Sequence, residues 1–389
     1  MSSALLSGVT GGTSVGCHRR APRPFAPHAP RAARAAAAAP LPATRAAPRR
    51  ARAPPPAAAA EAGAAGEAAA AAPAPAAGGR MTYRPNSYSE LVADAAAAVL
   101  AALEAGLTRM EVEFPPIPTN IDAYKGSSDL WIDSNVQLAL AGAKLIAASG
   151  RRVHVVLPDL GEYARSYKIF KSSLEALGGA VTLGHLKEAS AKSGGFDPLN
   201  SFQSLFAGGA PDPAPAGAAA DVFLVTNVSC VEVPNLEAYC QTVAKGKAFA
   251  TWNLELDSLR GDLGLLGLPP KDVHYRFLSS IRPVFFLRPR DYSKSVSVAP
   301  FIVNYSGALF REFPGPWQVM LKQDSGVYAC IAEDVVRYNL GEVKEELMAA
   351  MGLNTEEVGS MAAFLRRGYK TSTWFEDDAA LEQSKEWRM

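Results

Sequence analysis

The pattern of apolar and polar positions divides the chain into parts of different character. Between residues 87 and 256, stretches with apolar residues three or four positions apart alternate with short, almost wholly apolar runs. Such runs are typical of strands buried on both faces of a parallel sheet, whose neighbours need crossover connections. The pattern therefore predicts an α/β fold, with a mainly parallel sheet flanked by helices in a Rossmann-like, three-layer arrangement.

Helix caps and terminators define the elements expected in this part. Ser87 precedes an apolar stripe that ends at Gly106, and Ser134 precedes another that ends at Gly150, so each serine is expected to cap a helix. Further helices and the intervening strands follow from the same periodicities. The helices are expected over 162–179 and 234–246, and the strands within 107–116, 151–159, 180–186, 221–229 and 247–256.

The pattern changes after residue 257, where strand-like runs follow one another without helices. They cover 280–292, 300–313, 317–326 and 327–336 and predict an antiparallel β meander in the C-terminal half. Pro314, Gly315 and Pro316 interrupt pairing because proline cannot donate to a sheet ladder, so Trp317 is expected to begin a new strand. A closing helix is expected over 340–352, and residues 353–389 are expected to form a loosely attached C-terminal tail.

The N-terminal 80 residues have a different composition. They carry ten arginines, no lysine and only two acidic residues, Glu61 and Glu67, among Ala, Pro, Ser and Thr. Such a segment buries too little apolar surface to order itself, so residues 1–80 are expected to be a transit peptide and disordered linker that address the protein to the chloroplast. The alternative is a basic nucleic-acid-binding tail.

Without this segment the charge balance becomes acidic. Residues 81–389 contain 29 basic and 36 acidic residues, a net charge near −7, so we expect no nucleic-acid partner. No run reaches the roughly 18 apolar residues of a membrane helix, and we expect at most peripheral membrane contact. Residues 81–352 are thus expected to form one α/β domain, with a Gly/Ala/Pro-rich surface loop at 188–220.

Polar residues gather where the expected strands end. Ligands of open α/β sheets bind beyond the carboxyl ends of the strands, which makes this edge the candidate binding cleft. If its strand continues, Asn253, Glu255 and Asp257 share one face, and their carboxylates could act as an acid/base pair or bind Mg²⁺. The candidate residues are Asn120, Asp159, Glu162, Asn227, Asn253, Glu255, Asp257 and Arg260.

A structural role for the same polar residues is the favoured alternative. Asp159 and Asn227 would cap helices, while Glu255 and Asp257 would pair with Arg260. No phosphate-binding loop, GxGxxG helix start or GxSxG elbow is present outside the leader. His154, His185 and His274 are expected in a strand interior, at a strand end and in a solvated stretch, which disfavours a histidine-based site. We therefore assign no catalytic residue, metal or cofactor.

The corner after the second C-terminal strand, between residues 300–313 and 317–326, is a candidate partner surface. Arginine and aromatic residues dominate interface hot spots, and Arg311, Pro314, Gly315, Pro316 and Trp317 lie together here. In this hypothesis Trp317 anchors a partner polypeptide or the membrane interface, and Arg311 binds a carboxylate or a lipid phosphate. The alternative is that Trp317 packs in the core, where tryptophan is usually buried.

Four strings in this order resemble one known family. They are "RMEVEFPP" at 109–116, residues 153–166, "WNLELDSLRGDLG" at 252–264 and "GALFREFPGPWQVM" at 307–320. The sequence resembles, roughly from Ser87 to Met351, the plastid and cyanobacterial domain-of-unknown-function family that includes the Low PSII Accumulation Three proteins. It departs from that assembly factor at 188–220 and 287–307.

The resemblance implies an accessory role rather than a reaction. It points to a chloroplast assembly factor that is expected to be noncatalytic, with protein partners such as photosystem II subunits or the thylakoid insertion machinery. The family has no established catalytic residues, and some members are fused to a chloroplast adenylate kinase. The rival hypothesis is a plastid enzyme that uses the strand-end acids on a nucleotide or a phosphorylated small molecule.

Overall fold

The computed structural model describes residues 78–118, 128–187, 210–296, 299–353 and 371–389. Ten strands of this part form one mixed sheet in the order β1-β10-β9-β8-β7-β2-β6-β5-β3-β4. The strands are β1 (Thr82–Tyr83), β2 (Arg109–Glu113), β3 (Val153–Leu157), β4 (Val181–His185), β5 (Val222–Val225), β6 (Ala248–Trp252), β7 (Arg282–Ser295), β8 (Ile302–Glu312), β9 (Trp317–Lys322) and β10 (Tyr328–Asp334).

The sheet consists of a parallel half and an antiparallel half that join at β7. Strands β2 to β6 pair parallel with one another, and β7 pairs parallel with β2. Strands β7, β8, β9 and β10 pair antiparallel as the predicted meander, and β1 pairs antiparallel with β10 at its edge. Strand β7 belongs to both halves because it pairs with β2 on one side and with β8 on the other. The predicted α/β fold is thus confirmed, and so is its C-terminal antiparallel extension.

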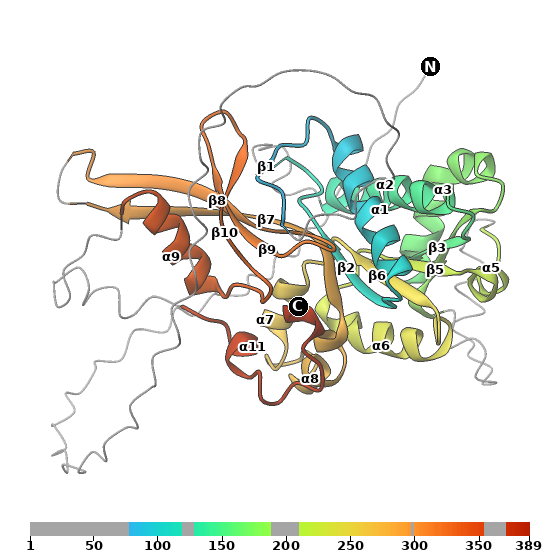
Figure 1. Ribbon diagram of the computed structural model, residues 1–389. Coiled ribbons are helices and arrows are strands. Elements are labelled where there is room, and N and C mark those ends of the chain that lie inside the picture. Colours follow the sequence, from blue (N-terminus) through green and yellow to red (C-terminus); the bar gives the residue numbers. More distant parts are fainter. Residues whose placement is uncertain (1–77, 119–127, 188–209, 297–298, 354–370) are drawn as a thin grey trace, which may run out of the picture. The chain divides into compact units, whose positions relative to one another are not determined.

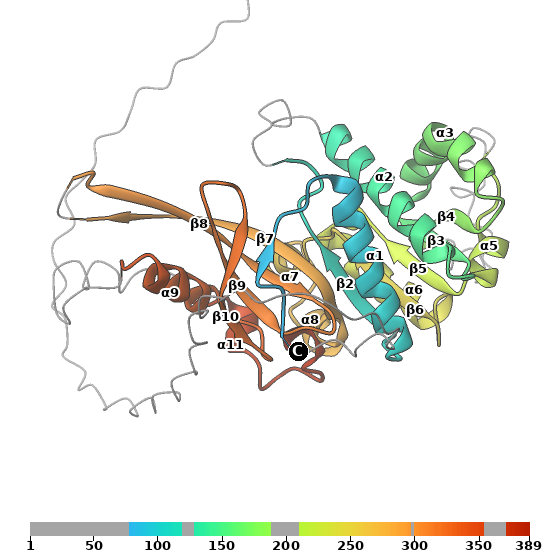
Figure 2. The same ribbon diagram turned by 45° about the horizontal axis from the view of Figure 1, so that its top comes forward.

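Helices cover both faces of the parallel half (Figures 1 and 2). Apolar side chains of α1, α2 and α3 form one core with the sheet, while those of α6, α7 and α8 form a second core on its other face. Helix α9 packs on the meander through a third cluster that contains Trp317. The helices are α1 (Tyr88–Glu104), α2 (Ser128–Ala147), α3 (Leu160–Ala176), α5 (Ala214–Ala219), α6 (Val233–Thr242), α7 (Leu256–Asp262), α8 (Asp272–Arg276), α9 (Leu340–Ala350) and α11 (Trp374–Asp377), with short 3₁₀ turns at Cys230–Glu232, Leu278–Ser280 and Glu386–Arg388.

Helix starts follow the sequence signals in some places and not in others. Ser87 caps α1 by accepting a hydrogen bond from the amide of Glu90, as predicted. The predicted start of the second helix at Ser134 is wrong, because α2 begins at Ser128. Within the segment expected to be a surface loop at 188–220, the described residues include α5, which is a short helix.

The prediction of a loosely attached C-terminal tail is wrong for residues 371–389, which we call the C-terminal segment. Its Phe375 and Trp387 are 3% and 1% exposed. The amide of Gln383 donates to the carbonyl of Tyr275 at 2.8 Å, and the amide of Arg337 donates to the carbonyl of Arg388 at 2.7 Å. Phe375 and Trp387 therefore anchor this segment by burying their side chains, although its sequence has no helical periodicity.

Candidate functional site

Three asparagines form a hydrogen-bonded ladder along the carboxyl edge of the parallel strands. The amide of Phe114 donates to Oδ1 of Asn253 at 2.9 Å, and Nδ2 of Asn253 donates to Oδ1 of Asn135 at 3.2 Å. Asn135, in α2, donates in turn to Oδ1 of Asn227 at 3.2 Å. Asn253 and Asn227 have φ angles of 52° and 60°, a left-handed conformation that asparagine tolerates better than most residues. The ladder therefore gives these amides a structural role.

Two acidic residues of the predicted binding cleft, Asp159 and Glu162, lie at the start of α3 beside this ladder. Oδ1 of Asp159 accepts a hydrogen bond from the amide of Glu162 at 2.9 Å, so Asp159 caps the helix. Nδ2 of Asn227 approaches Oε2 of Glu162 at 3.5 Å. Burial, helped by the nearby Asp159 carboxylate, raises the pKa of Glu162 to about 7. Glu162 is thus poised to exchange a proton near neutral pH.

The expectation that Asn253, Glu255 and Asp257 share one strand face is wrong. Strand β6 ends at Trp252, before any of them. Glu255 has a φ of 51° and precedes α7, while Asp257 lies in the first turn of that helix. The chain therefore turns twice where a continuing strand was expected, and Asp257 faces the opposite side of the sheet from the ladder.

Asp257 lies among three guanidinium groups beneath the sheet. Its carboxylate is 3.0 Å from Nη1 of Arg260 and 3.3 Å from Nη1 of Arg288, and it accepts a hydrogen bond from Arg337. Burial alone would raise the pKa of Asp257, but the charges of Arg337, Arg288 and Arg260 together hold it well below its usual range. The predicted pairing of Asp257 with Arg260 is confirmed, and Asp257 remains an ionised structural acid.

Strand β2 adds two acidic residues that the candidate set omitted. Glu111 and Glu113 point to the same face as Asp257 and are 1% and 5% exposed. Oε2 of Glu111 is 3.7 Å from Nη2 of Arg260, and Oε1 of Glu113 is 3.3 Å from Nη1 of Arg288. Burial raises the pKa of both carboxyls, that of Glu113 to about 8. The signal was present, because two glutamates on one face of a central parallel strand depart from its usual apolar character.

A pocket of about 300 Å³ opens at this carboxyl edge. Its walls are mainly apolar, formed by Phe114 and the prolines that follow it, by Trp131 of α2, and by Leu287 and Pro289 of β7. The polar groups in the walls come from Glu113, Glu255 and Arg288. Apolar walls with a few charged groups suit a hydrophobic side chain from a polypeptide or a small organic molecule.

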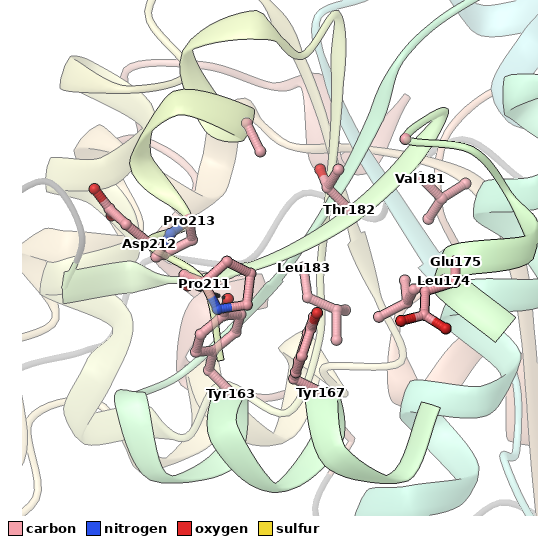
Figure 3. A pocket seen from close by; sticks show the side chains of 12 residues that line it. Tyr163, Tyr167, Leu174, Glu175, Val181, Thr182, Leu183, Pro211, Asp212 and Pro213 are labelled. Carbon is pink, nitrogen blue, oxygen red and sulfur yellow. Dashed lines mark hydrogen bonds between the residues drawn. The ribbon is translucent and has the colours of Figure 1, made fainter. Parts of the chain in front are cut away.

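A second pocket, of about 190 Å³, lies between α3, β4 and the segment before α5. Figure 3 shows Tyr163 and Tyr167 rising from α3 towards Leu183 and Pro211. The hydroxyl of Tyr163 donates to the carbonyl of Pro211 at 2.6 Å, and this bond links α3 to the segment before α5. This pocket contains none of the predicted site residues, so it offers a comparison surface for experiments.

The hypothesis of an exposed anchor at the Pro-Gly-Pro corner is wrong for Trp317 and Arg311, and the alternative, that Trp317 packs in the core, is confirmed. Trp317 begins β9, as expected, but its side chain is 0% exposed and packs edge-on against Phe286 at 5.4 Å between ring centroids. Arg311 is 5% exposed and lies 5.3 Å above the Trp317 ring. Both side chains point to the sheet face that α9 and the C-terminal segment cover. Of the five residues in the predicted surface, only Pro314 is exposed.

The predicted cleft residues are only partly brought together. Asp159, Glu162, Asn227 and Asn253 gather on the ladder side of the edge, whereas Asp257 and Arg260 lie in the buried ion-pair network. Asn120 lies outside the described residues. His274, expected in a solvated stretch, is 0% exposed and contacts Glu382 of the C-terminal segment at 3.0 Å.

Comparison with known proteins shows the family of the chain. A family model described as "Domain of unknown function (DUF1995)" matches residues 85–345, and the chain belongs to this family. No curated protein and no solved structure matches the chain.

No described helix combines the length and the apolar character that a membrane span requires. Within the described ranges, no three His, Cys, Asp or Glu side chains are grouped as metal ligands would be.

Proposed function

We propose that this protein is a noncatalytic accessory factor of the chloroplast that binds another polypeptide during photosystem II biogenesis or related thylakoid assembly. Three features support the proposal. The leader has the composition of a plastid transit peptide, the four strings resemble those of the Low PSII Accumulation Three proteins, and the family model matches most of the domain.

The observation that carries the proposal is that polar groups at the strand ends are already paired with other groups of the protein. Asp257 is held by Arg260, Arg288 and Arg337, and Asn253 is held in the ladder. Groups engaged in this way are not available for a substrate. What the carboxyl edge offers is the pocket beside Trp131, and an aromatic residue in an apolar pocket is a common hot spot for protein binding.

Capture from chloroplasts tests the proposal. Tagged protein, its Trp131→Ala variant and a Tyr167→Ala control at the second pocket would be expressed with the native leader and purified from separate stroma and thylakoid fractions. We expect wild type and Tyr167→Ala to retain photosystem II subunits or insertion machinery and Trp131→Ala to lose them. Equal recovery by all three proteins, or recovery of neither class of partner, would contradict the proposal.

A second candidate function rests on two carboxyls whose pKa values are raised to near neutral pH. Glu162 and Glu113, with pKa values of about 7 and 8, are able to accept and donate protons near neutral pH. The protein would then be a plastid enzyme acting on a nucleotide or a phosphorylated small molecule. Turnover of such a compound by purified protein, abolished by both Glu113→Gln and Glu162→Gln but retained by Tyr167→Ala, would establish it and replace the first proposal.

A further inference from the structure

Beneath the C-terminal segment, arginines from β8, from α7 and from the chain before α9 stack on aromatic rings. We call Arg260, Phe286, Arg311, Trp317 and Arg337 the arginine–tryptophan face. The guanidinium of Arg337 lies 4.8 Å from the ring centroid of Phe286 and 5.0 Å from that of Trp317, and Arg311 stacks on the same Trp317 ring. Arginine and tryptophan are the residues that most often dominate protein-binding hot spots.

This face carries cationic donors that the described residues leave unsatisfied. Nε and Nη1 of both Arg311 and Arg337 are buried without a hydrogen-bond partner, and so is Nε1 of Trp317. Among the described residues, Arg311 has no carboxylate within ion-pair distance. Burial, together with the nearby charge of Arg282, lowers the pKa of Arg311 to about 9. Buried donors of this kind favour an anionic partner.

The C-terminal segment brings acidic and aromatic residues to this face. Trp387 stacks with Arg260 at 4.7 Å and with Arg337 at 5.2 Å, and its Nε1 donates to Oε1 of Glu382 at 2.9 Å. Burial opposes ionisation of Glu382, but hydrogen bonds from His274 and Arg388 lower its pKa below the usual range. The remaining acids of the segment are Glu376, Asp377, Asp378 and Glu386.

This segment has the properties of a replaceable occupant. Its helical pieces, α11 and the turn Glu386–Arg388, contain four and three residues, too few to form helices on their own. It lies wholly beyond residue 345, where the family match ends, so it is not part of what defines the domain.

We propose that the arginine–tryptophan face is a docking surface for an acidic, tryptophan-containing segment of a partner polypeptide, and that the C-terminal segment occupies it in competition with that partner. This inference concerns a surface distinct from the pocket beside Trp131. Its test uses purified protein, so the result does not depend on capture from chloroplasts.

A labelled peptide with the sequence of residues 371–389 serves as the partner surrogate, added to full-length protein. We expect weak binding to wild type and binding about tenfold tighter or more to Trp387→Ala, whose own segment has lost one of its two aromatic anchors. The control variant Tyr167→Ala, at the second pocket, should bind like wild type. Adding Arg337→Gln to Trp387→Ala should remove the gain.

Altered peptides keep the test decisive if the Arg337→Gln protein does not fold. A peptide with Glu382→Gln and Glu386→Gln, or with Trp387→Ala, should lose most of its affinity for the Trp387→Ala protein. Three results would overturn the proposal: no gain on Trp387→Ala, equal binding of the altered peptides, or a stable dimer with exchanged C-terminal segments, which would make a second copy the occupant.

Discussion

Asp257 and Arg337, 80 positions apart in the chain, form a buried ion pair in which Nη2 of Arg337 donates to Oδ2 of Asp257. Because Asp257 also faces Arg260 and Arg288, it is the shared counter-charge of three guanidinium groups. The pair connects the start of α7 to the chain just before α9. It thereby links the parallel half of the sheet to the helix that packs on the meander.

Asp257→Asn should therefore destabilise the protein strongly. The substitution removes the carboxylate charge that faces the buried guanidinium of Arg337 and leaves Arg260 and Arg288 with only Glu111 and Glu113 beside them. Breaking buried pairs in this way typically costs about 3–5 kcal/mol. Urea denaturation measures the loss. Asp221→Asn, at the exposed pair with Arg152, is the control and should cost about 1 kcal/mol or less. Equal losses for the two variants would show that Asp257 has no such shared role.

Asn135→Ala should weaken the ladder at its centre. Without the Asn135 amide, Nδ2 of the buried Asn253 loses its partner, and an unsatisfied buried group costs about 1–3 kcal/mol. Oδ1 of the half-buried Asn227 also loses its bond, at a smaller cost. Gln137→Ala, an exposed change on the same helix, should stay within about 0.5 kcal/mol of wild type. Thermal unfolding of both variants measures this, and a stable Asn135→Ala protein would mean that the ladder contributes little.

Glu113→Gln should change how stability depends on pH. The folded pKa of Glu113 is about 8 against 4.5 for an ordinary glutamate, so the folded state keeps a proton that the unfolded chain loses. The contribution of Glu113 is then complete below pH 4.5 and declines as the pH rises towards about 8, by at most about 1.4 kcal/mol per pH unit.

Glutamine cannot titrate, so the stability of Glu113→Gln relative to wild type should rise between pH 5 and pH 8. Urea denaturation at each pH measures the difference between the two free energies of unfolding. A difference that stays constant across this range would contradict the raised pKa of Glu113.

Gly142→Ala should disturb the packing of α2 on the sheet. A Cβ atom at Gly142 would overlap the ring of Trp252, which is fully buried at the end of β6. Overpacking of this kind costs about 1–3 kcal/mol. Gly261→Ala, in α7, meets nothing within 4 Å and should be neutral or stabilise by up to about 1 kcal/mol. Melting temperatures that fall equally for both variants would show that the close approach to Trp252 is not the cause.

The candidate site could be predicted only where the signals were local. Asp159 lies three positions before the amide that it caps, and Asp257 pairs with Arg260 across the same interval, so both pairings were foreseeable. The positions of Trp317 and Arg311 were not, because the face that they present is covered by residues far away in the chain.

The sequence by itself determined the α/β alternation, the antiparallel strands that follow it, and the start of α1. These features depend on periodicity and on contacts within a few residues, which the order of amino acids records directly. The tertiary structure alone decided that β2 lies between β6 and β7, that Glu111 and Glu113 meet arginines, and that the C-terminal segment covers Trp317. Strand order and burial arise from contacts between distant residues, and a local pattern does not specify which distant residues will meet.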